Sequence, residues 1–552
     1  MITAAAGKAN CPGVIIEPGR FEKDIQETIA RIEAGNIVKR IWDRDHTVWK
    51  PGPGEITNRL GWLTLPEKMQ GEIPGIEAFA GEIRSAFDSA VLLGMGGSSL
   101  APEMFADIFG ADIDFTVLDT TVPAAIRAAA QRLDPQKSLF IVSTKSGGTV
   151  ETISLFRYFH HLFAGKGSGF AAITDPGSTL AATASQLHFR RTFLNDPDVG
   201  GRFSALSFFG LVPAGLCGVD IRLLLEKARG AMLACRPETP VRDNPGAVLG
   251  AAIGEAARQG ADKLTFFISP RIFSFGHWLE QLIAESTGKE GRGILPVTGE
   301  RPGGKYGNDR FFVFIELEGE EYPEALHAEA SRNGPTARIR LPDVYALGEQ
   351  VFIWEMATAV AGHVLKINPF DQPDVESTKR AARSVVAEIE KGSFALPAAD
   401  SFGSGVSVFG AAGKTPADAL RGFLAKAGGG NYICIQAYLP MTPGIDASIA
   451  EIRERLRMTG AAVTSGYGPR YLHSTGQLHK GDSGKGLFIQ LTAEPEEDLP
   501  VPSSRISFGA LTMAAALGDR KALLDAGRPV IALHLEDPKK GLDYILQALK
   551  DL

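Results

Sequence analysis

The sequence predicts an α/β protein made of parallel sheets covered by helices. Two observations support this fold class. Short apolar runs alternate with amphipathic helical patterns along most of the chain, and turns rich in Gly and Ser join them. A near-continuous apolar run is typical of a strand buried on both faces, as in a parallel sheet between two helical layers. The chain has 552 residues, 44% of them hydrophobic, so it can form several such units.

The first parallel-sheet unit is expected over residues 46–215, after an N-terminal arm and helices over residues 1–45. Amphipathic helical patterns follow its apolar runs, which is the order of a βαβ unit. The strands of this unit are predicted at residues 90–96, 115–120, 138–143 and 170–175.

A second unit of the same kind is expected over residues 216–390, and a smaller α/β unit over residues 416–552. Residues 391–415 are rich in Gly, Ser, Ala and Pro and are interpreted as a linker. The strands of the second unit are predicted at residues 262–270, 310–317 and 336–341, and those of the smaller unit at residues 431–439, 486–492 and 529–536.

Composition excludes several classes of function. The formal charge of −7 argues against a general nucleic-acid binder. The four cysteines are far apart and form no CxxC pair, which indicates a reduced protein without a disulfide framework or a zinc ribbon. The N-terminus has no long apolar core, and no stretch has the length of a membrane span. We therefore expect a cytoplasmic protein with no membrane partner.

The stretch STKSGGTVET, residues 143–152, lies where a predicted strand turns into a helix. The first amides of a helix are unpaired, and that end of the helix is positive. Two adjacent glycines let a ligand approach the backbone closely, and hydroxyl groups can donate to the oxygens of an anion. A capped helix start alone would explain one hydroxyl but not the whole cluster. The loop therefore predicts a phosphate site formed by Thr144, Lys145, Ser146 and Thr149.

Another loop, GMGGSSLAP at residues 94–102, has similar chemistry, with Gly97 and Ser98 opening a helix. Its spacing nearly matches the dinucleotide fingerprint, and Asp119 follows where a ribose-binding acid could lie. An NAD-dependent dehydrogenase would leave the hydroxyl-rich loop at residues 143–152 unexplained, whereas one sugar phosphate held by both loops explains the two. The stretch GAAGKT at residues 410–415 lacks the first glycine of a P-loop and is interpreted as a turn.

Five stretches resemble the motifs of the phosphoglucose isomerase family, whose fold has two sugar-isomerase (SIS) domains. The resemblance spans roughly residues 40–380, with the five motifs in order, and the remainder is most similar to the isomerase half of transaldolase–phosphoglucose isomerase fusions. The five stretches are GMGGSSLAP, STKSGGTVET, GGRFSALS (200–207), EQLIAESTGK (280–289) and NPFDQPDVESTK (368–379).

The resemblance implies interconversion of glucose 6-phosphate and fructose 6-phosphate through a cis-enediolate. Glu285 matches the family's catalytic base, Arg202 the arginine that stabilises the enediolate, and Lys379 the lysine that assists ring opening. Gln281 lies one helical turn before the glutamate and matches a ligand on the phosphate side.

The ring-opening histidine departs from the family's sequence order. The family places it between the glutamate and the lysine, where this chain has only His327 and His363 in unrelated contexts. The stretch HSTGQ after the predicted linker is similar to the surroundings of that histidine in some bacterial members. This similarity favours His473, with His479 as the alternative. The spacing of these two histidines does not suit a metal site, and no cysteine is near in sequence.

The resemblance further implies a reaction that needs neither a metal nor a redox cofactor. It also implies a homodimer in which the histidine enters the neighbouring subunit's site. A non-catalytic SIS-type sensor of sugar phosphates is the alternative, and it would not need Glu285, Arg202 or Lys379. The sequence leaves open whether mannose 6-phosphate is a substrate.

Overall fold

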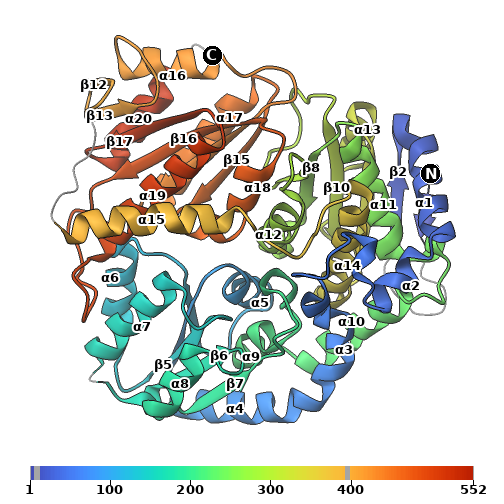
Figure 1. Ribbon diagram of the computed structural model, residues 1–552, viewed down its shortest axis with the longest axis horizontal. Coiled ribbons are helices and arrows are strands. Elements are labelled where there is room, and N and C mark those ends of the chain that lie inside the picture. The colour runs from blue at the N-terminus through green and yellow to red at the C-terminus, as the bar shows by residue number, and fades with distance from the viewer. Residues whose placement is uncertain (1, 5–12, 164, 392–397, 551–552) are drawn as a thin grey trace.

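The computed structural model describes residues 2–4, 13–163, 165–391 and 398–550, and for residues 3, 4, 375–379 and 390 it describes the backbone alone. It contains three sheets flanked by helices, so the predicted fold class of two parallel-sheet domains and a further α/β unit is confirmed. Figure 1 shows the first unit in cyan to teal, the second in green with the blue N-terminal segment beside it, and the third in orange to red.

The first sheet has five parallel strands in the order β4-β3-β5-β6-β7. The chain runs from β3 outward to β4, then returns to the other side of β3 to form β5. The strand order therefore reverses between β3 and β5, and at such a point open parallel sheets bind ligands beyond the carboxyl ends of the strands. The strands are β3 (Ser89–Gly94), β4 (Asp114–Leu118), β5 (Ser138–Ser143), β6 (Phe170–Thr174) and β7 (Arg191–Leu194).

Helices cover both faces of the first sheet. Apolar side chains of β3 and β5 point alternately into two separate hydrophobic clusters, one on each face. The helices of this unit are α4 (Ile73–Ala86), α5 (Leu100–Phe109), α6 (Pro123–Arg132), α7 (Val150–Leu162), α8 (Thr179–Gln186) and α9 (Phe208–Leu216).

The second sheet has the order β1-β2-β11-β10-β8-β9. Its last four strands are parallel, while the N-terminal segment adds β1 and β2 as an antiparallel edge. The segment expected as an arm with helices thus also extends this sheet. The strands are β1 (Ile2–Ala4), β2 (Val14–Glu17), β8 (Lys263–Ile268), β9 (Leu295–Val297), β10 (Arg310–Leu317) and β11 (Thr336–Leu341).

Helix α14 (Leu347–Leu365) lies in the centre of the second unit and is apolar on nearly all sides, as expected for a helix surrounded by protein. It packs against α10 and α11, and Gly250 allows the backbones of α11 and α14 to approach closely at Ala357. The other helices of this part are α1 (Glu22–Ala34), α2 (Ile37–Trp42), α3 (Leu65–Lys68), α10 (Ile221–Ala234), α11 (Pro245–Arg258), α12 (Phe275–Thr287) and α13 (Glu324–Asn333).

The third sheet has the order β12-β13-β17-β16-β14-β15, and its last four strands are parallel. Strands β12 and β13 lie within residues 391–415, the range expected to be a linker, and β13 pairs antiparallel with β17. Residues 392–397 of that range lie outside the described part. The strands are β12 (Ser401–Gly403), β13 (Val406–Phe409), β14 (Tyr432–Tyr438), β15 (Ala462–Tyr467), β16 (Gly486–Ala493) and β17 (Val530–Leu535).

Helix α15 (Val375–Glu390) runs between the third unit and the first (Figure 1). It packs against α19, and Gly518 of α19 lies so close to Ala382 that a Cβ atom there would be 2.7 Å from the Ala382 backbone nitrogen. The helices of the third unit are α16 (Pro416–Leu424), α17 (Pro443–Arg457), α18 (Gly476–Gly481), α19 (Phe508–Asp525) and α20 (Pro538–Ala548).

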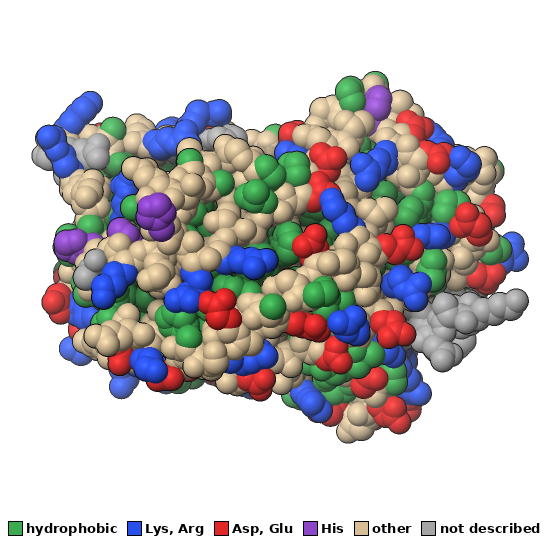
Figure 2. Space-filling view, turned by 90° about the horizontal axis from the view of Figure 1, so that it is seen from below, with side chains coloured by type: hydrophobic (Ala, Val, Ile, Leu, Met, Phe, Trp, Pro, Cys, Tyr) green, Lys and Arg blue, Asp and Glu red, His purple; other side chains and the backbone are tan. Residues whose placement is uncertain are grey.

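Acidic and basic side chains are interspersed over the face shown in Figure 2 rather than gathered by sign. Among the described helices, none is both long and apolar enough to cross a membrane.

Candidate active site

The two loops predicted to hold phosphate follow β3 and β5, the strands between which the order of the first sheet reverses. Gly94 at the end of β3 pairs with Ser143 at the end of β5, so both loops begin at the same edge of the sheet. The hydroxyl of Ser143 donates to the carbonyl of Ser98 over 3.2 Å and ties the loops together. The sheet topology therefore brings the two loops to one place where a small anion is expected to bind.

In the second of these loops, which follows β5, hydroxyl groups lie next to one another at the start of α7. Thr149 is the N-cap residue of this helix, and its Oγ1 atom lies 3.0 Å from Oγ1 of Thr144. The amide of Gly148 donates to the Ser146 hydroxyl over 3.3 Å. Gly147 has a φ of +73°, and a Cβ atom there would lie 2.7 Å from the Leu180 backbone nitrogen. The loop thus needs glycine for both its backbone conformation and its packing.

Lys145 is held away from these hydroxyls by other partners. Its ammonium group forms an ion pair with Asp175 and also donates to the carbonyl of Pro197 over 2.9 Å. The groups that this loop presents to a small anion are therefore hydroxyls and backbone amides rather than the ammonium of Lys145.

Glycines let three further segments pack against the first loop, which follows β3. A Cβ atom on Gly97 would lie 2.1 Å from the carbonyl oxygen of Gly201, and one on Gly96 would lie 2.6 Å from the carbonyl oxygen of His473 and 2.8 Å from Nε2 of Gln281. The segments carrying the predicted arginine, histidine and glutamine thus converge on this loop, although they come from all three units.

Glu285 and Gln281 lie one turn apart on α12, and both side chains are buried. Nε2 of Gln281 donates to Oε2 of Glu285 over 3.2 Å and to the His473 carbonyl over 2.7 Å. Its Oε1 atom is buried without a hydrogen-bond partner among the described residues. Gln281 therefore connects Glu285 to the first phosphate loop and to the segment of His473.

Arg202 lies in the short 3-10 helix η8 (Gly201–Phe203), and its side chain is 3% exposed. Its Nη1 atom is 3.6 Å from Oε1 of Glu285, and its Nε donates to the Ser286 hydroxyl over 2.7 Å. Nη2 donates to the carbonyls of Pro369, at 2.6 Å, and Asp371, at 3.0 Å. Burial lowers the pKa of Arg202, but a guanidinium in a protein remains charged. A buried cation is thus fixed beside a buried carboxylate.

Lys289 also belongs to this cluster, although the sequence did not single it out. Its side chain is 1% exposed, and Nζ donates to the carbonyl of Asp371 at 2.5 Å and to its Oδ1 atom at 2.8 Å. Burial first, and then the nearby charge of Arg202, lower the pKa of Lys289 to about 8. A lysine that follows a glycine has no sequence pattern that would indicate a role in the site. The position of Lys289 in the cluster is seen only because the structure brings Asp371, far away in sequence, next to it.

His473 ends η12 (Arg470–His473) in the third unit, and its ring reaches the first unit. Its Nε2 atom lies 3.1 Å from Oε1 of Glu151 on α7. The sequence pattern around Glu151 indicates no more than a part in a helix cap. An imidazole paired with a carboxylate is suited to proton transfer, since the carboxylate orients the ring.

His479, the alternative histidine, lies in the interior of the third unit. It is 1% exposed, and its ring contacts Sγ of Cys434 at 3.6 Å and Nε2 of Gln436 at 3.4 Å. Burial lowers its pKa well below the usual value, so the ring is neutral. These surroundings favour a packing role for His479 and leave His473 as the candidate acid/base.

Lys379 lies in the first turns of α15, but its side chain is outside the described part of the structure. Its role in ring opening therefore stays a prediction. Among the described residues, no group of three or more His, Cys, Asp or Glu side chains could hold a metal ion.

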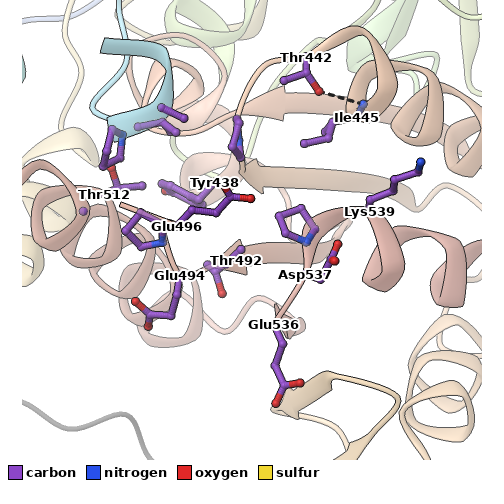
Figure 3. Close-up of a pocket in the computed structure, with 18 of the residues that line it drawn as sticks. Tyr438, Thr442, Ile445, Thr492, Glu494, Glu496, Thr512, Glu536, Asp537 and Lys539 are labelled. Atoms are coloured by element: carbon purple, nitrogen blue, oxygen red, sulfur yellow. Dashed lines mark hydrogen bonds between the residues drawn. The ribbon is translucent and has the colours of Figure 1, made fainter. Parts of the chain in front are cut away.

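A separate hollow of about 580 Å³ lies beyond the carboxyl ends of β14, β16 and β17. Figure 3 shows Tyr438, Thr442, Thr492 and several acidic side chains around it. Six carboxylates and only two basic side chains line this hollow, so a phosphate ester would be repelled there. None of the site residues predicted from the sequence lines it.

The fold and the site define a class of protein: an α/β chain in which a sheet edge with hydroxyl-rich loops faces a buried carboxylate, a guanidinium and an imidazole. A family model described as phosphoglucose isomerase matches residues 67–293. A glucose-6-phosphate isomerase from Carboxydothermus hydrogenoformans is 30% identical over 397 residues, which is 59% of this chain and 85% of that protein. One from Streptococcus pneumoniae is 27% identical over 428 residues, which is 65% of this chain and 94% of that protein. The chain belongs to the phosphoglucose isomerase family.

Solved structures agree on the fold. The crystal structure of a glucose-6-phosphate isomerase from Chlamydia trachomatis is similar with a TM-score of 0.59 and 18% identity, and it covers 69% of this chain and 89% of that one. A hypothetical protein from Thermus thermophilus is similar with a TM-score of 0.58 and 25% identity. The match covers 68% of this chain and all of the Thermus chain.

Proposed function

We infer that this chain is an aldose–ketose isomerase that interconverts glucose 6-phosphate and fructose 6-phosphate. Membership of the family and the curated relatives support the activity. The single observation that supports it most within the structure is the placement of Glu285 beside Arg202 and Gln281, against the loop that begins at Gly96. A carboxylate and a cation are the two groups that proton transfer through an enediolate requires.

We propose that the phosphate group binds the two loops after β3 and β5. The ligands would be the backbone at Gly97 and the hydroxyls of Ser98, Thr144, Ser146 and Thr149. Their support is the convergence of the loops at one sheet edge and the helix N-terminus at Thr149. Gln281, whose Oε1 atom is buried without a partner among the described residues, would accept a hydrogen bond from a sugar hydroxyl.

Glu285 would act as the base in the isomerisation step. Its carboxylate takes the proton from C2 of the open-chain aldose. The electron pair of that C–H bond forms the C1–C2 double bond of the enediolate while the π pair of the C1 carbonyl moves onto O1. A proton then passes from the C2 hydroxyl to O1, and the carboxyl group returns its proton to C1 as the C2 carbonyl forms, which gives the ketose. Arg202 would stabilise the negative charge that develops on the enediolate oxygen, and its fixed hydrogen bonds hold it in place for this role.

His473 would open and close the sugar ring, with Lys379 assisting. The imidazole donates a proton to the ring oxygen as the C1–O5 bond breaks, while the C1 hydroxyl gives its proton to water and its C–O bond becomes the C1 carbonyl. Support for this role comes from the pairing of His473 with Glu151 and from the interior position of His479. Because Glu151 belongs to the same chain, we propose that each subunit of a homodimer supplies its own histidine.

A coupled assay on the purified chain tests the activity. Fructose 6-phosphate should be converted to glucose 6-phosphate, and an NADP-linked dehydrogenase would report the product. Mannose 6-phosphate supplied in a parallel reaction would define the specificity at C2. A protein that binds the sugar phosphates but turns over neither of them would instead be a sensor.

We also propose that the third unit corresponds to the C-terminal part of the isomerase half in transaldolase–isomerase fusions. The support is the HSTGQ segment that brings His473 to the first unit. Sedimentation velocity of the purified chain would test the proposed homodimer.

A further inference from the structure

Arg470 and His473 stand at the two ends of η12, a single turn of 3-10 helix. Side chains three residues apart eclipse in a 3-10 helix, so these two project from the same side. That side faces the first unit: His473 meets Glu151 of α7, and Arg470 meets Glu103 of α5 and Asp119 at the end of β4. The turn is therefore attached to the first unit at both ends.

The guanidinium of Arg470 is held in one orientation by two carboxylates. Nη1 lies 2.9 Å from Oδ2 of Asp119 and 2.9 Å from Oε1 of Glu103, and Nη2 forms an ion pair with the other oxygen of Glu103. Side-chain exposure is 15% for Arg470 and 5% for Asp119. A planar guanidinium that engages a carboxylate through two nitrogens fixes orientation as well as distance, which a lysine ammonium cannot do.

The same cluster reaches the first phosphate loop. The hydroxyl of Ser99 donates to Oδ2 of Asp119 over 3.1 Å and to the carbonyl of Gly96 over 3.1 Å. Ser99 directly follows Ser98, one of the proposed phosphate ligands. Asp119 thus joins the guanidinium of Arg470 to the loop on which the carbonyl of His473 rests.

We propose that Arg470 is a positioning residue for ring opening: by holding η12 to Glu103 and Asp119, it sets the imidazole of His473 against the sugar held by the first loop. The inference rests on the proposed function of His473. Without the guanidinium, the turn would keep its Gln281 contact at the His473 carbonyl but lose the attachment at its other end. A displacement of about 1 Å in a catalytic group can cost on the order of 10²-fold in rate.

The test separates ring opening from isomerisation. NMR exchange between the α and β anomers of glucose 6-phosphate measures ring opening, and exchange of the C2 hydrogen for deuterium measures enediolate formation. In Arg470→Gln, the rate of anomer exchange should fall on the order of 10²-fold. The rate of deuterium exchange at C2 of open-chain substrate should fall by less. Arg470→Lys keeps the charge but loses the planar guanidinium that contacts Glu103 through two nitrogens. It should give an intermediate loss of anomer exchange, and it serves as the test if Arg470→Gln folds poorly.

A matched control and a double variant exclude a purely structural role. Arg455→Gln removes another arginine of the third unit, which pairs with Glu451 and with the carbonyl of Leu546, and it should leave anomer exchange unchanged. In a His473→Ala background, Arg470→Gln should cause no further loss of anomer exchange, since both variants act through the same imidazole.

Two results would overturn the inference. One is normal anomer exchange in folded Arg470→Gln while His473→Ala has lost it. The other is an equal loss from Arg470→Gln with and without His473. If His473→Ala alone leaves anomer exchange intact, the proposed role of the histidine fails instead, and this single variant identifies that case.

Discussion

The Nε2 atom of His473 lies 3.1 Å from Oε1 of Glu151, although 322 positions separate the two residues in sequence. One belongs to the third unit and the other to the helix that follows the hydroxyl-rich loop. The loop proposed to hold the phosphate and the carboxylate that contacts the histidine are therefore parts of a single strand-to-helix connection. If both proposed roles hold, α7 links substrate binding to ring opening.

Replacing Glu151 should impair ring opening without removing the acid/base itself. Glu151→Gln keeps the size of the side chain but not the negative charge beside the imidazole. We expect a smaller loss of anomer exchange than the ~10²–10⁴-fold associated with removing a general acid/base. Deuterium exchange at C2 of open-chain substrate should change little. Equal losses in both measurements would contradict this assignment.

Replacing Glu285 should abolish most isomerisation while leaving binding intact. Glu285→Gln keeps a hydrogen-bonding side chain next to Gln281 but cannot accept the C2 proton, so turnover should fall by roughly 10²–10⁴-fold. The measurements are the coupled assay and calorimetric binding of a sugar phosphate. Glu290→Gln is the matched control, because that glutamate is about half exposed and pairs only with Lys50 among the described residues. Near-normal turnover of Glu285→Gln would refute the role.

The phosphate loop can be tested by removing one hydroxyl. Thr149→Ala should raise KM for fructose 6-phosphate roughly tenfold or more, because a hydrogen bond to a charged group contributes about 1.5–3 kcal/mol. Competition by inorganic phosphate should weaken in parallel. Thr183→Ala provides the control, since its hydroxyl donates to the carbonyl of Thr179 in its own helix. An unchanged KM for Thr149→Ala would place the phosphate elsewhere.

Lys289 predicts a pH dependence of stability with a definite sign. Its pKa falls from the usual value of 10.5 to about 8 in the folded protein because the side chain is buried. Between these two values the unfolded chain binds more protons than the folded one, so the free energy of unfolding rises with pH across that window. Relative to Lys289→Met, the wild type should gain stability from about pH 8 to pH 10.5. Denaturant unfolding of both proteins at several pH values measures this.

Lys289 should make the activity fall as the pH rises, whereas its effect on stability has the opposite sign. The protonated ammonium donates to Asp371, whose carbonyl also accepts from Arg202. Above a pH of about 8 the ammonium loses its proton. The segment that holds Arg202 should then loosen, and kcat should fall. A pH profile of kcat in Lys289→Met that keeps the wild-type alkaline limb would exclude this explanation.

The sequence predicted the sheets well where strands are long and apolar. Strands such as β5 and β10 are buried along their whole length and read as continuous apolar runs. Strand β15 was missed because it contains Thr, Ser and Gly and is only half-buried at one end, and β9 has only three residues. Strands β12 and β13 lie in a Gly- and Ser-rich segment that resembles a linker, and they form by pairing with the edge strand β17.

The sequence indicated those parts of the candidate site whose residues lie close together along the chain. Hydroxyls and glycines close in sequence indicated the two proposed phosphate loops, and resemblance to a family suggested Glu285, Arg202 and His473; the structure places the loops and these residues near one another, and their roles stay predictions. Contacts such as those of Lys289 with Asp371 and of Arg470 with Asp119 join segments far apart in the chain. No periodicity in one sequence records such contacts, because they depend on how the three units pack.

The close packing of Gly97 against Gly201 predicts that one added methyl group at Gly97 will lower activity by displacing Arg202. In Gly97→Ala the new Cβ atom would lie 2.1 Å from the carbonyl oxygen of Gly201, so one of the two segments must move. Arg202 follows Gly201 directly and would be displaced relative to the phosphate loop. We expect kcat/KM to fall on the order of 10²-fold, since small misplacements of catalytic groups have effects of that size. Gly230→Ala, at a position where nothing lies within 4 Å, is the control and should keep full activity. Steady-state kinetics and thermal unfolding of both variants decide the matter: full activity in Gly97→Ala would mean that the contact between the two loops does not set the position of Arg202.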